Sequence, residues 1–304
     1  MTSATRHHTK TYLRRLFDEL GISPTTKLGQ NFLVDPNLQH FIVDAAEIEP
    51  GDVVLEVGTG TGALTALVAE RASAVVTVEL DRHLFELASE HLFDRANVTL
   101  LRQDALRNKN AMDDRVLEAV RERLEGADGS FKLVSNLPYN IATPVISNLL
   151  GNEPHPATMT VTIQKELGER IVAGPKTKDY SALSVWVQCQ ADARIVRILP
   201  PTVFWPRPKV ESAIVRIDVD EARRASIPDR QYFRQFVKAM FLHRRKFLRA
   251  NLAPAMKRHL SKAQVDEILE ELSLTGNVRT EELDVPTLLR LCERVRRAAP
   301  DWRL

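Results

Sequence analysis

The sequence VLEVGTGTGALT, residues 54–65, joins an apolar, β-branched run to a helical pattern through a turn that contains three glycines. Gly58, Gly60 and Gly62 occupy that turn. Glycine is favoured where the backbone needs a positive φ or where a ligand approaches the main chain closely. The segment therefore predicts a buried strand, a ligand-binding turn and a helix, which together open an α/β domain.

Strands and helices alternate on both sides of this turn. Helical spacing is found from Ala63 to Arg71 and from His83 to Phe93. Short runs rich in β-branched residues, which predict strands, occupy residues 52–57, 74–78, 98–102, 132–135 and 158–163. Alternation of this kind builds a parallel sheet with helices on both faces. We expect a Rossmann-like, doubly wound α/β fold, with one more strand at Val210 to Val219 after a proline-rich stretch.

Two segments depart from the alternation. Residues 107–131 form a charged, helix-prone connection, which we expect to be a surface excursion. After Asp220 the composition becomes helical, and apolar residues recur at the spacing of one helix face: Tyr232, Phe233, Phe236, Val237, Met240 and Phe241. The sequence therefore predicts a small helical domain from residue 220 to 304.

The charge of the chain is distributed unevenly. The net charge is only +2, but residues 223–262 hold twelve Lys or Arg against a single acid, Asp229. That segment carries +11, and the remainder of the chain carries −9. Clustered cations favour a polyanionic partner such as nucleic acid, through the release of its counterions. The alternative interpretation is a solvated helix face.

Several classes of protein are disfavoured by the composition. No run of 18 or more apolar residues and no secretory signal pattern is present, so we expect a cytoplasmic protein without a membrane segment. Arg6, Lys10, Arg14 and Arg15 precede the first acid, which leaves an organellar transit segment as an alternative. The two cysteines, Cys189 and Cys292, lack CxxC spacing, and the eight histidines show no ligand spacing. We expect no metal.

Acidic residues follow the next two predicted strands. Glu79 in VELD lies seventeen residues beyond Gly62, where its carboxylate can accept hydrogen bonds from both hydroxyls of a ribose. Asp104 in QDAL is suited to an exocyclic amine such as N6 of adenine. A dinucleotide-binding dehydrogenase is the obvious alternative, but its fingerprint is G-x-G-x-x-G, whereas this turn has G-x-G-x-G.

The tetrapeptide Asn136–Leu137–Pro138–Tyr139 follows the fourth predicted strand. The side-chain oxygen of Asn136 and the carbonyl of Leu137 can accept both hydrogens of an exocyclic amine and favour a more pyramidal nitrogen, whose lone pair then points at an incoming methyl group. Tyr139 offers an aromatic face to a base flipped out of its stack. The alternative is an Asn-x-Pro turn that caps a helix beginning near Thr143.

A second aromatic candidate is Phe204, which stands in the proline-stiffened segment FWPRPKV, residues 204–210. We expect Phe204 to close the other side of the target base. Its neighbour Trp205 is the weaker candidate for that role, and a packing position is the alternative for both.

Taken together, these motifs resemble the ribosomal RNA adenine dimethyltransferases, which modify two adjacent adenines near the 3′ end of small-subunit ribosomal RNA. The resemblance covers about residues 27 to 252, in family order. Its matching segments are KLGQNFLVD (27–35), VLEVGTGTGALT (54–65), VELD (78–81), QDAL (103–106), NLPYNIATPVI (136–146), QKELGERIVAGP (164–175), DYSALSV (179–185), FWPRPKVESAIVR (204–216) and HRRKFLRANL (243–252).

The resemblance implies an S-adenosylmethionine-dependent enzyme with a class I methyltransferase domain at residues 27–219, an extension at 1–26 and an RNA-docking or ribosome-docking domain at 220–304. It assigns a set of residues to cofactor binding: Asn31, Leu33, Gly58, Glu79, Asp104 and Asn136. It also implies catalytic roles for the tetrapeptide at 136–139 and for Phe204. The expected product is N6,N6-dimethyladenosine, made on a partly assembled small ribosomal subunit.

Two further readings of the function stay open at the level of sequence. One is a methyltransferase that acts on adenine of 23S ribosomal RNA and confers antibiotic resistance, against which NLPYNI and FWPRPKV argue. The other is a non-catalytic RNA-binding assembly or transcription factor, against which the intact cofactor residues argue. We expect a monomer, because no long apolar helix face is left without an assignment.

Overall fold

The computed structural model describes residues 9–25, 29–274 and 277–304. The chain divides into two compact units. The sheet unit comprises Met1–Gly168 and Arg194–Asp218, and the helical unit comprises Glu169–Ala193 and Val219–Leu304. The division falls between Asp218 and Val219, one residue before the expected boundary at 219/220, and residues 169–193 group with the helical unit rather than with the sheet. Parts of the expected extension (1–8 and 26) and of the KLGQNFLVD segment (27 and 28) lie outside the described residues.

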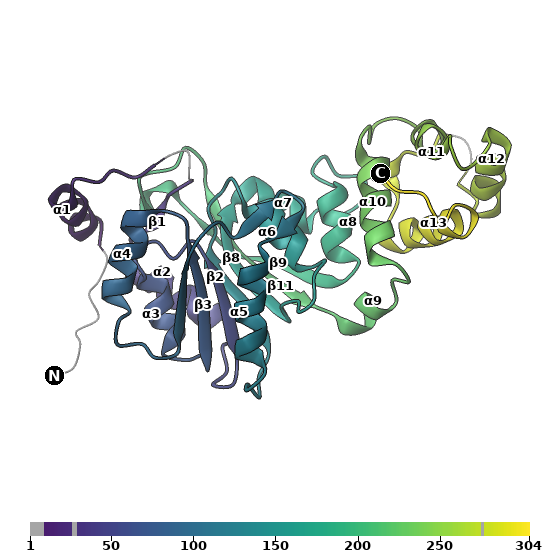
Figure 1. Cartoon of the computed structure of the whole chain (residues 1–304). Helices are drawn as coiled ribbons and strands as arrows, with labels where there is room; N and C mark the ends of the chain where they lie inside the picture. The colour runs from purple at the N-terminus through teal and green to yellow at the C-terminus, as the bar shows by residue number, and fades with distance from the viewer. Residues whose placement is uncertain (1–8, 26–28, 275–276) are drawn as a thin grey trace. The chain divides into compact units, whose positions relative to one another are not determined.

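A central sheet organises the described part of the sheet unit (Figure 1). Its seven strands lie in the order β4-β3-β2-β7-β8-β11-β9. Their bounds are β2 Val53–Val57, β3 Ala74–Glu79, β4 Val98–Arg102, β7 Phe131–Asn136, β8 Thr158–Gln164, β9 Ala191–Leu199 and β11 Ser212–Val219. Neighbouring strands from β4 to β8 are parallel, and β11 runs antiparallel to β8. The predicted fold class is confirmed.

Every residue of β2 and β3 is buried, which explains why both strands are apolar or β-branched apart from Glu56 and Glu79. One face of the sheet packs against α2 and α3, where Ile42 and Val68 meet Val54 and Val134 in one apolar cluster. The other face is covered by α5, as Figure 1 shows. The helices of this part of the chain are α1 Lys10–Leu20, α2 Pro36–Ala45, α3 Ala63–Ala69, α4 Arg82–His91, α5 Asp114–Leu124, α6 Ala142–Leu149 and α7 Lys165–Val172.

The helix-prone character expected of residues 107–131 is confirmed, but the expectation that they form a surface excursion was wrong. After a small hairpin of β5 (Leu106–Asn108) and β6 (Ala111–Met112), the segment forms α5, which packs against β2 and β3. Val116, Leu117 and Val120 are buried along one side of this helix. α5 therefore belongs to the crossover that carries the chain from β4 at the sheet edge back to β7 beside β2. The many charged residues of this segment hid the apolar side of an amphipathic helix.

The strand order reverses beside β2, because the chain proceeds from β2 to β3 and β4 and then returns to β7 on the opposite side. Open α/β sheets bind ligands in the crevice beyond the carboxyl ends of their strands at such a reversal. A separate two-stranded ladder lies elsewhere in this unit, where β1 (Phe32–Leu33) pairs with β10 (Phe204–Trp205) in antiparallel register.

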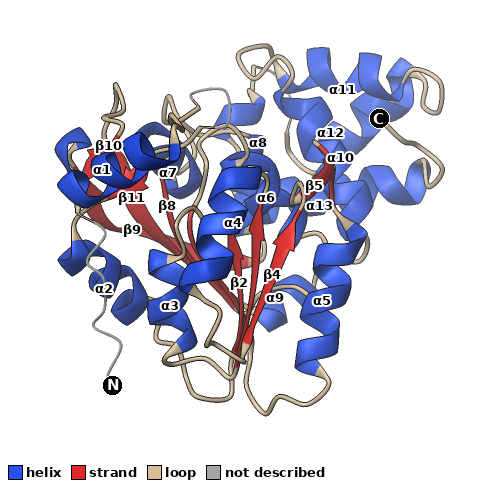
Figure 2. Cartoon of the chain, turned by 60° about the vertical axis from the view of Figure 1, so that its left-hand side comes forward, coloured by secondary structure: helices blue, strands red, loops and turns tan. Residues whose placement is uncertain are grey.

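The helical unit has its own apolar core around α10, whose Phe233, Phe236 and Met240 are buried. α10 packs against α8, α11 and α13. The helices of this unit are α8 Ala182–Gln188, α9 Glu221–Ala225, α10 Arg230–Phe241, α11 Leu248–Met256, α12 Lys262–Glu271 and α13 Val285–Ala298, with short 3-10 turns η2 Pro201–Val203 in the sheet unit and η3 Thr280–Glu282 here. Across the described residues, no helix has the length and apolarity that crossing a membrane requires. Figure 2 distinguishes these helices from the strands by colour.

Candidate active site

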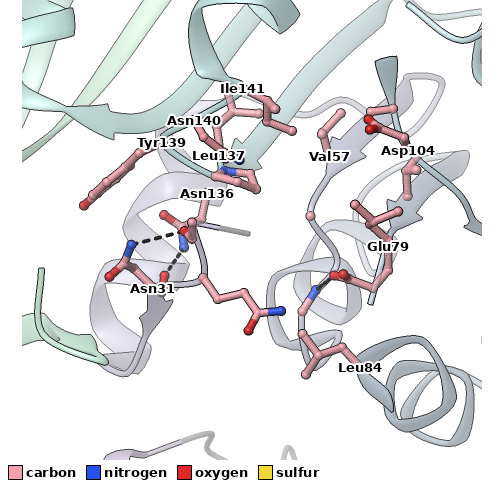
Figure 3. Close-up of a pocket in the computed structure, with 18 of the residues that line it drawn as sticks. Asn31, Val57, Glu79, Leu84, Asp104, Asn136, Leu137, Tyr139, Asn140 and Ile141 are labelled. Carbon is pink, nitrogen blue, oxygen red and sulfur yellow. Dashed lines mark hydrogen bonds between the residues drawn. The ribbon is translucent and has the colours of Figure 1, made fainter. Parts of the chain in front are cut away.

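A cavity of about 270 Å³ lies at the carboxyl ends of β2, β3, β4 and β7. The main cavity, as we call it, receives five of the predicted cofactor residues: Asn31, Gly58, Glu79, Asp104 and Asn136. Leu137, Pro138 and Tyr139 also line it. In Figure 3, Asn31, Asn136 and Tyr139 lie on one side of this cavity, and Glu79 and Asp104 lie on the other. Residues from four strand ends are thus brought to one place.

The glycine turn has the backbone that the sequence predicted. Gly58, Gly60 and Gly62 have φ angles of 88°, 58° and 81°, all in the left-handed region. A Cβ at Gly58 would lie 3.1 Å from Cδ of Pro138, in the tetrapeptide at residues 136–139. Any residue other than glycine at this position would be strained and would also displace Pro138.

Glu79 stands at the end of β3 and is only 7% exposed. Its Oε2 accepts a hydrogen bond of 2.8 Å from the backbone N–H of Gly60, and its Oε1 accepts one of 2.9 Å from the N–H of Asp81. Burial raises the pKa of the Glu79 carboxyl, and these two hydrogen bonds oppose that rise. The carboxylate is therefore held in a fixed orientation at the cavity wall.

Asp104 follows β4 and is exposed at the rim of the main cavity. One carboxylate oxygen, Oδ1, accepts a hydrogen bond of 2.9 Å from the N–H of Leu106. This bond fixes the side chain in a local turn, and Oδ2 remains as a further acceptor.

Asn136 is held by the segment that precedes α2. Its Nδ2 donates a hydrogen bond of 2.9 Å to the carbonyl oxygen of Asn31, and Nδ2 of Asn31 donates one of 3.1 Å to the carbonyl of Gly29 (Figure 3). Oδ1 of Asn136 is thereby left as an acceptor at the cavity. The alternative of a helix cap is excluded, because α6 has Ile141 at its N-cap position and no side-chain cap bond.

Leu137 and Tyr139 are fixed by neighbouring strands. The side chain of Leu137 is buried, and its N–H donates a hydrogen bond of 3.1 Å to the carbonyl of Thr162 in β8. The ring of Tyr139 is half-buried at the cavity, and its hydroxyl lies 2.5 Å from that of Ser212. The tetrapeptide is thus tied to both β8 and β11.

Two predicted residues are not brought to the main cavity. Phe204 and Leu33 face each other in the β1–β10 ladder and are 2% and 6% exposed in the apolar core. The structure therefore gives Phe204 the packing position, because pairing with β1 turns its side chain inward. Trp205, the weaker candidate, packs against Phe17 and Phe32.

Sequence reasoning missed several residues of this site. Leu80 is 50% exposed and lines the main cavity, and an apolar residue between the acids of VELD was the signal for it. Gln30 also lines the cavity, and its Nε2 donates to Oδ2 of Asp81 at 3.4 Å. Ser212, the partner of Tyr139, gave no signal, since it lies far from the tetrapeptide in sequence.

A buried polar network supports the glycine turn. Oε2 of Glu56 accepts hydrogen bonds from the hydroxyls of Thr65 at 2.5 Å and Thr77 at 2.8 Å. The Thr77 hydroxyl lies 2.6 Å from that of Thr59, inside the turn. Burial, together with the nearby charge of Glu79, raises the pKa of Glu56 to about 8, although the hydrogen bonds from Thr65 and Thr77 oppose that rise. Glu56 is therefore neutral at pH 7, and its carboxyl supports the turn rather than a ligand.

The basic segment at 223–262 is partly neutralised within the helical unit. Arg223 pairs with Asp192, Arg249 with Asp266, and Arg244 with Glu281. Arg224 is 2% exposed and donates to Oε1 of Gln190. By contrast, Arg245 and Lys246 are exposed beside a surface hollow formed by residues 241–246. These two cations are candidates for contact with phosphates.

The chain is similar in sequence to one protein family and to individual proteins of known name. A family model described as ribosomal RNA adenine dimethylase matches residues 23–295. The ribosomal RNA small subunit methyltransferase A of Pediococcus pentosaceus is 38% identical over 286 residues, which cover 94% of each chain. The protein of the same name from Moorella thermoacetica is 41% identical over 76% of this chain and 79% of its own.

Solved structures agree on the fold. A dimethyladenosine transferase from Plasmodium falciparum superposes with a TM-score of 0.72 at 23% identity, covering 87% of this chain and 97% of its own. The 23S rRNA methyltransferase ErmE superposes with a TM-score of 0.57 at 25% identity, covering 86% and 98%.

Proposed function

The chain belongs to the ribosomal RNA adenine dimethylase family, and on that premise we propose that it methylates N6 of two adjacent adenines near the 3′ end of small-subunit ribosomal RNA. The methyl donor is S-adenosylmethionine, and the product is N6,N6-dimethyladenosine. The observation that carries the proposal is the placement of Asn136, the glycine turn and Glu79 around one cavity.

The residues of the main cavity fit S-adenosylmethionine. Gly58 lines the cavity without a side chain, so a ligand can approach its backbone closely. Glu79 presents a fixed carboxylate to two ribose hydroxyls, Asp104 accepts from an adenine amine, and exposed Leu80 offers an apolar surface to the ring. Bound there, the cofactor supplies an electrophilic methyl group on a positively charged sulfur. We propose that no metal takes part.

Asn136 and Leu137 orient the target amine. The lone pair of an adenine N6 is delocalised into the ring, so the amine is a weak nucleophile. Oδ1 of Asn136 and the carbonyl of Leu137 accept its two N–H bonds and favour a pyramidal nitrogen. The hydrogen bond to Asn31 fixes which way Oδ1 points. Catalysis rests on positioning, because the methylated nitrogen is acidic enough to release its proton to water.

Tyr139 supplies the stacking surface for the flipped adenine. Stacking of a base on an aromatic side chain contributes about 1–3 kcal/mol. The ring is held by Ser212, which sets its plane before the base arrives. With Phe204 in the core, Tyr139 carries this role in our proposal.

The substrate is a partly assembled small ribosomal subunit in the cytoplasm, and the enzyme acts as a monomer. Exposed Arg245 and Lys246 contribute to docking through phosphate contacts. Support for a small-subunit substrate comes from the relatives named for that subunit, at 38% and 41% identity, against 25% for ErmE.

The proposal is tested with radiolabelled S-adenosylmethionine and two substrates, unmethylated small subunits and large-subunit RNA. We expect label in the small-subunit RNA. Label confined to large-subunit RNA would move the chain to the resistance-type methyltransferases, and binding without transfer to either RNA would favour the assembly-factor interpretation.

A further inference from the structure

The amino-terminal helix α1 lies outside the residues that the family model matches, which begin at residue 23. We infer that α1 is part of the cofactor site: Leu13 and Phe17 hold the segment Gly29–Leu33 against the glycine turn and so set the affinity for S-adenosylmethionine. The inference rests on the proposed function, since it assumes that the cofactor binds in the main cavity.

Phe17 is the first link between α1 and this segment. Its side chain is 2% exposed, and its ring contacts Phe32 and Trp205 edge-on, at centroid distances of 5.4 Å and 5.1 Å. Phe32 and Trp205 stack on each other at 6.3 Å and are partners in the β1–β10 ladder. Edge-to-face aromatic contacts of this kind stabilise a defined arrangement of rings. Phe17 therefore fixes the orientation of Phe32.

Phe32 in turn contacts the glycine turn. A Cβ at Gly60 would lie only 3.3 Å from Cε1 of the Phe32 ring. The N–H of Gly60 is one of the two backbone groups that hold the Glu79 carboxylate. The contact of Phe17 with Phe32 and the contact of Phe32 with Gly60 therefore connect α1 to the backbone that holds Glu79.

Leu13 provides an independent connection. It is 1% exposed and lines a second cavity of about 50 Å³ on the inner side of the turn. This second cavity shares Phe32, Gly58, Gly60 and Asn136 with the main cavity. α1 thus contributes a wall directly behind residues that are proposed to touch the cofactor.

The segment Gly29–Leu33 is also held by residues of the main cavity. Asn31 accepts from Nδ2 of Asn136, and Gln30 donates to Asp81. Because the segment is bound by α1 on one side and by cavity residues on the other, docking of α1 and binding of cofactor stabilise the same conformation. Coupling of this kind is reciprocal: α1 raises cofactor affinity by the factor by which cofactor favours the docked α1.

The first test compares leucines of the same helix in the full chain. Leu13→Ala removes the cavity wall, whereas Leu20→Ala is a matched control, since Leu20 is 52% exposed. We expect Leu13→Ala and Phe17→Ala to raise the Kd for S-adenosylmethionine, measured by calorimetry, about tenfold, or about 1.4 kcal/mol. Phe17→Leu should restore part of the affinity, and Leu20→Ala should match the wild type.

The second test needs no variant. Amide hydrogen exchange in residues 10–20 of the wild-type protein should slow when S-adenosylhomocysteine, the demethylated cofactor, is added. Unchanged exchange in α1, or a wild-type Kd in both Leu13→Ala and Phe17→Ala, would overturn the inference.

Glu79→Ala separates this result from a failure of the proposed function. If Glu79→Ala loses cofactor binding while the α1 variants keep it, only the role of α1 is wrong. If Glu79→Ala also binds like the wild type, the cofactor lies elsewhere and the inference falls together with the proposed site.

Discussion

The hydroxyl of Tyr139 lies 2.5 Å from the hydroxyl of Ser212, which is fully buried at the start of β11. Ser212 is opposite Gln164 in the β8–β11 register, so its position is fixed by the sheet. Burial raises the pKa of Tyr139, and its phenol therefore keeps its proton at physiological pH. The contact joins the tetrapeptide that we propose receives the target base to the strand that follows the FWPRPKV segment.

Replacing Ser212 with Ala should loosen the Tyr139 ring without removing it. A neutral hydrogen bond contributes about 0.5–1.5 kcal/mol, so we expect a loss of about threefold to tenfold in kcat/KM for the small subunit. The Kd for S-adenosylmethionine should stay unchanged. Steady-state kinetics with calorimetry measure both quantities.

A double-mutant cycle isolates that contact. Ser212→Ala and Tyr139→Phe remove the same hydrogen bond from its two ends, so their effects should not add. Ser226→Ala, which removes an exposed hydroxyl bonded to the carbonyl of Arg223, serves as the control. Additive losses from Ser212→Ala and Tyr139→Phe would contradict a positioning role for Ser212.

Gly58→Ala should damage cofactor binding. Alanine at a φ of 88° costs about 1–2 kcal/mol, and its Cβ would press on Pro138 at 3.1 Å. We expect a lower Tm and a Kd for S-adenosylmethionine raised at least about tenfold, since strain and lost space act together. Gly126→Ala is the matched control, because no atom lies within 4 Å of a Cβ there. If Gly58→Ala and Gly126→Ala had the same Tm and the same Kd, the close packing of Gly58 against Pro138 would not matter for cofactor binding, and the prediction would be wrong.

Glu56 should make the stability of the protein pH-dependent. Its pKa is about 8 in the folded protein, against an ordinary value of 4.5. Between these values the folded state keeps a proton that the unfolded chain has lost. The free energy of unfolding therefore falls as the pH rises, by up to about 1.4 kcal/mol per pH unit.

Glu56→Gln removes this proton uptake and keeps an oxygen that accepts from Thr65 and Thr77. We expect the variant to match the wild type near pH 4.5 and to be the more stable protein at pH 8, as measured by urea unfolding at several pH values. Exposed Glu122→Gln should leave the pH dependence unchanged. Parallel curves for wild type and Glu56→Gln would show that Glu56 is ionised when folded.

Arg245 and Lys246 should act on substrate docking alone. Removing two phosphate contacts by Arg245→Ala/Lys246→Ala should raise the KM for small subunits about tenfold and reduce the salt dependence of binding. The Kd for S-adenosylmethionine should not change. Arg223→Ala, which removes a cation paired with Asp192, is the control. If Arg223→Ala raised the KM for small subunits as much as Arg245→Ala/Lys246→Ala does, the result would instead indicate non-specific attraction between the protein and RNA.

Local patterns predicted most of the sheet. The runs that form β2, β3, β4, β7, β8 and β11 are short, β-branched and bounded by turn residues, so each was found within two residues or so of its ends. β9 was missed, because it lies at the edge of the sheet and ADARIVRIL contains no run of buried residues. α5 was misjudged because its charges outnumber the three buried residues that dock it on the sheet.

The sequence predicted those residues of the site that lie at the ends of strands. Gly58, Glu79, Asp104 and Asn136 each stand at the carboxyl end of a predicted strand, and parallel strands bring such ends together. Contacts between segments far apart in sequence could not be predicted, because no local sequence pattern indicates them. The pairing of Leu33 with Phe204 and of Tyr139 with Ser212 appears only in the folded chain, and it decides which aromatic ring remains at the cavity.

The most direct test of the account is to identify the methylated nucleoside by mass spectrometry, after unmethylated small subunits and S-adenosylmethionine react with wild type or Asn136→Ala. Loss of the Asn136 acceptor should lower the rate at least about a hundredfold, by analogy with the removal of one oxyanion-hole donor. We predict N6,N6-dimethyladenosine at two adjacent adenines near the 3′ end of the small-subunit RNA with the wild type, and almost none with the variant. Methylation of another nucleoside, or equal yields from both proteins, would contradict it.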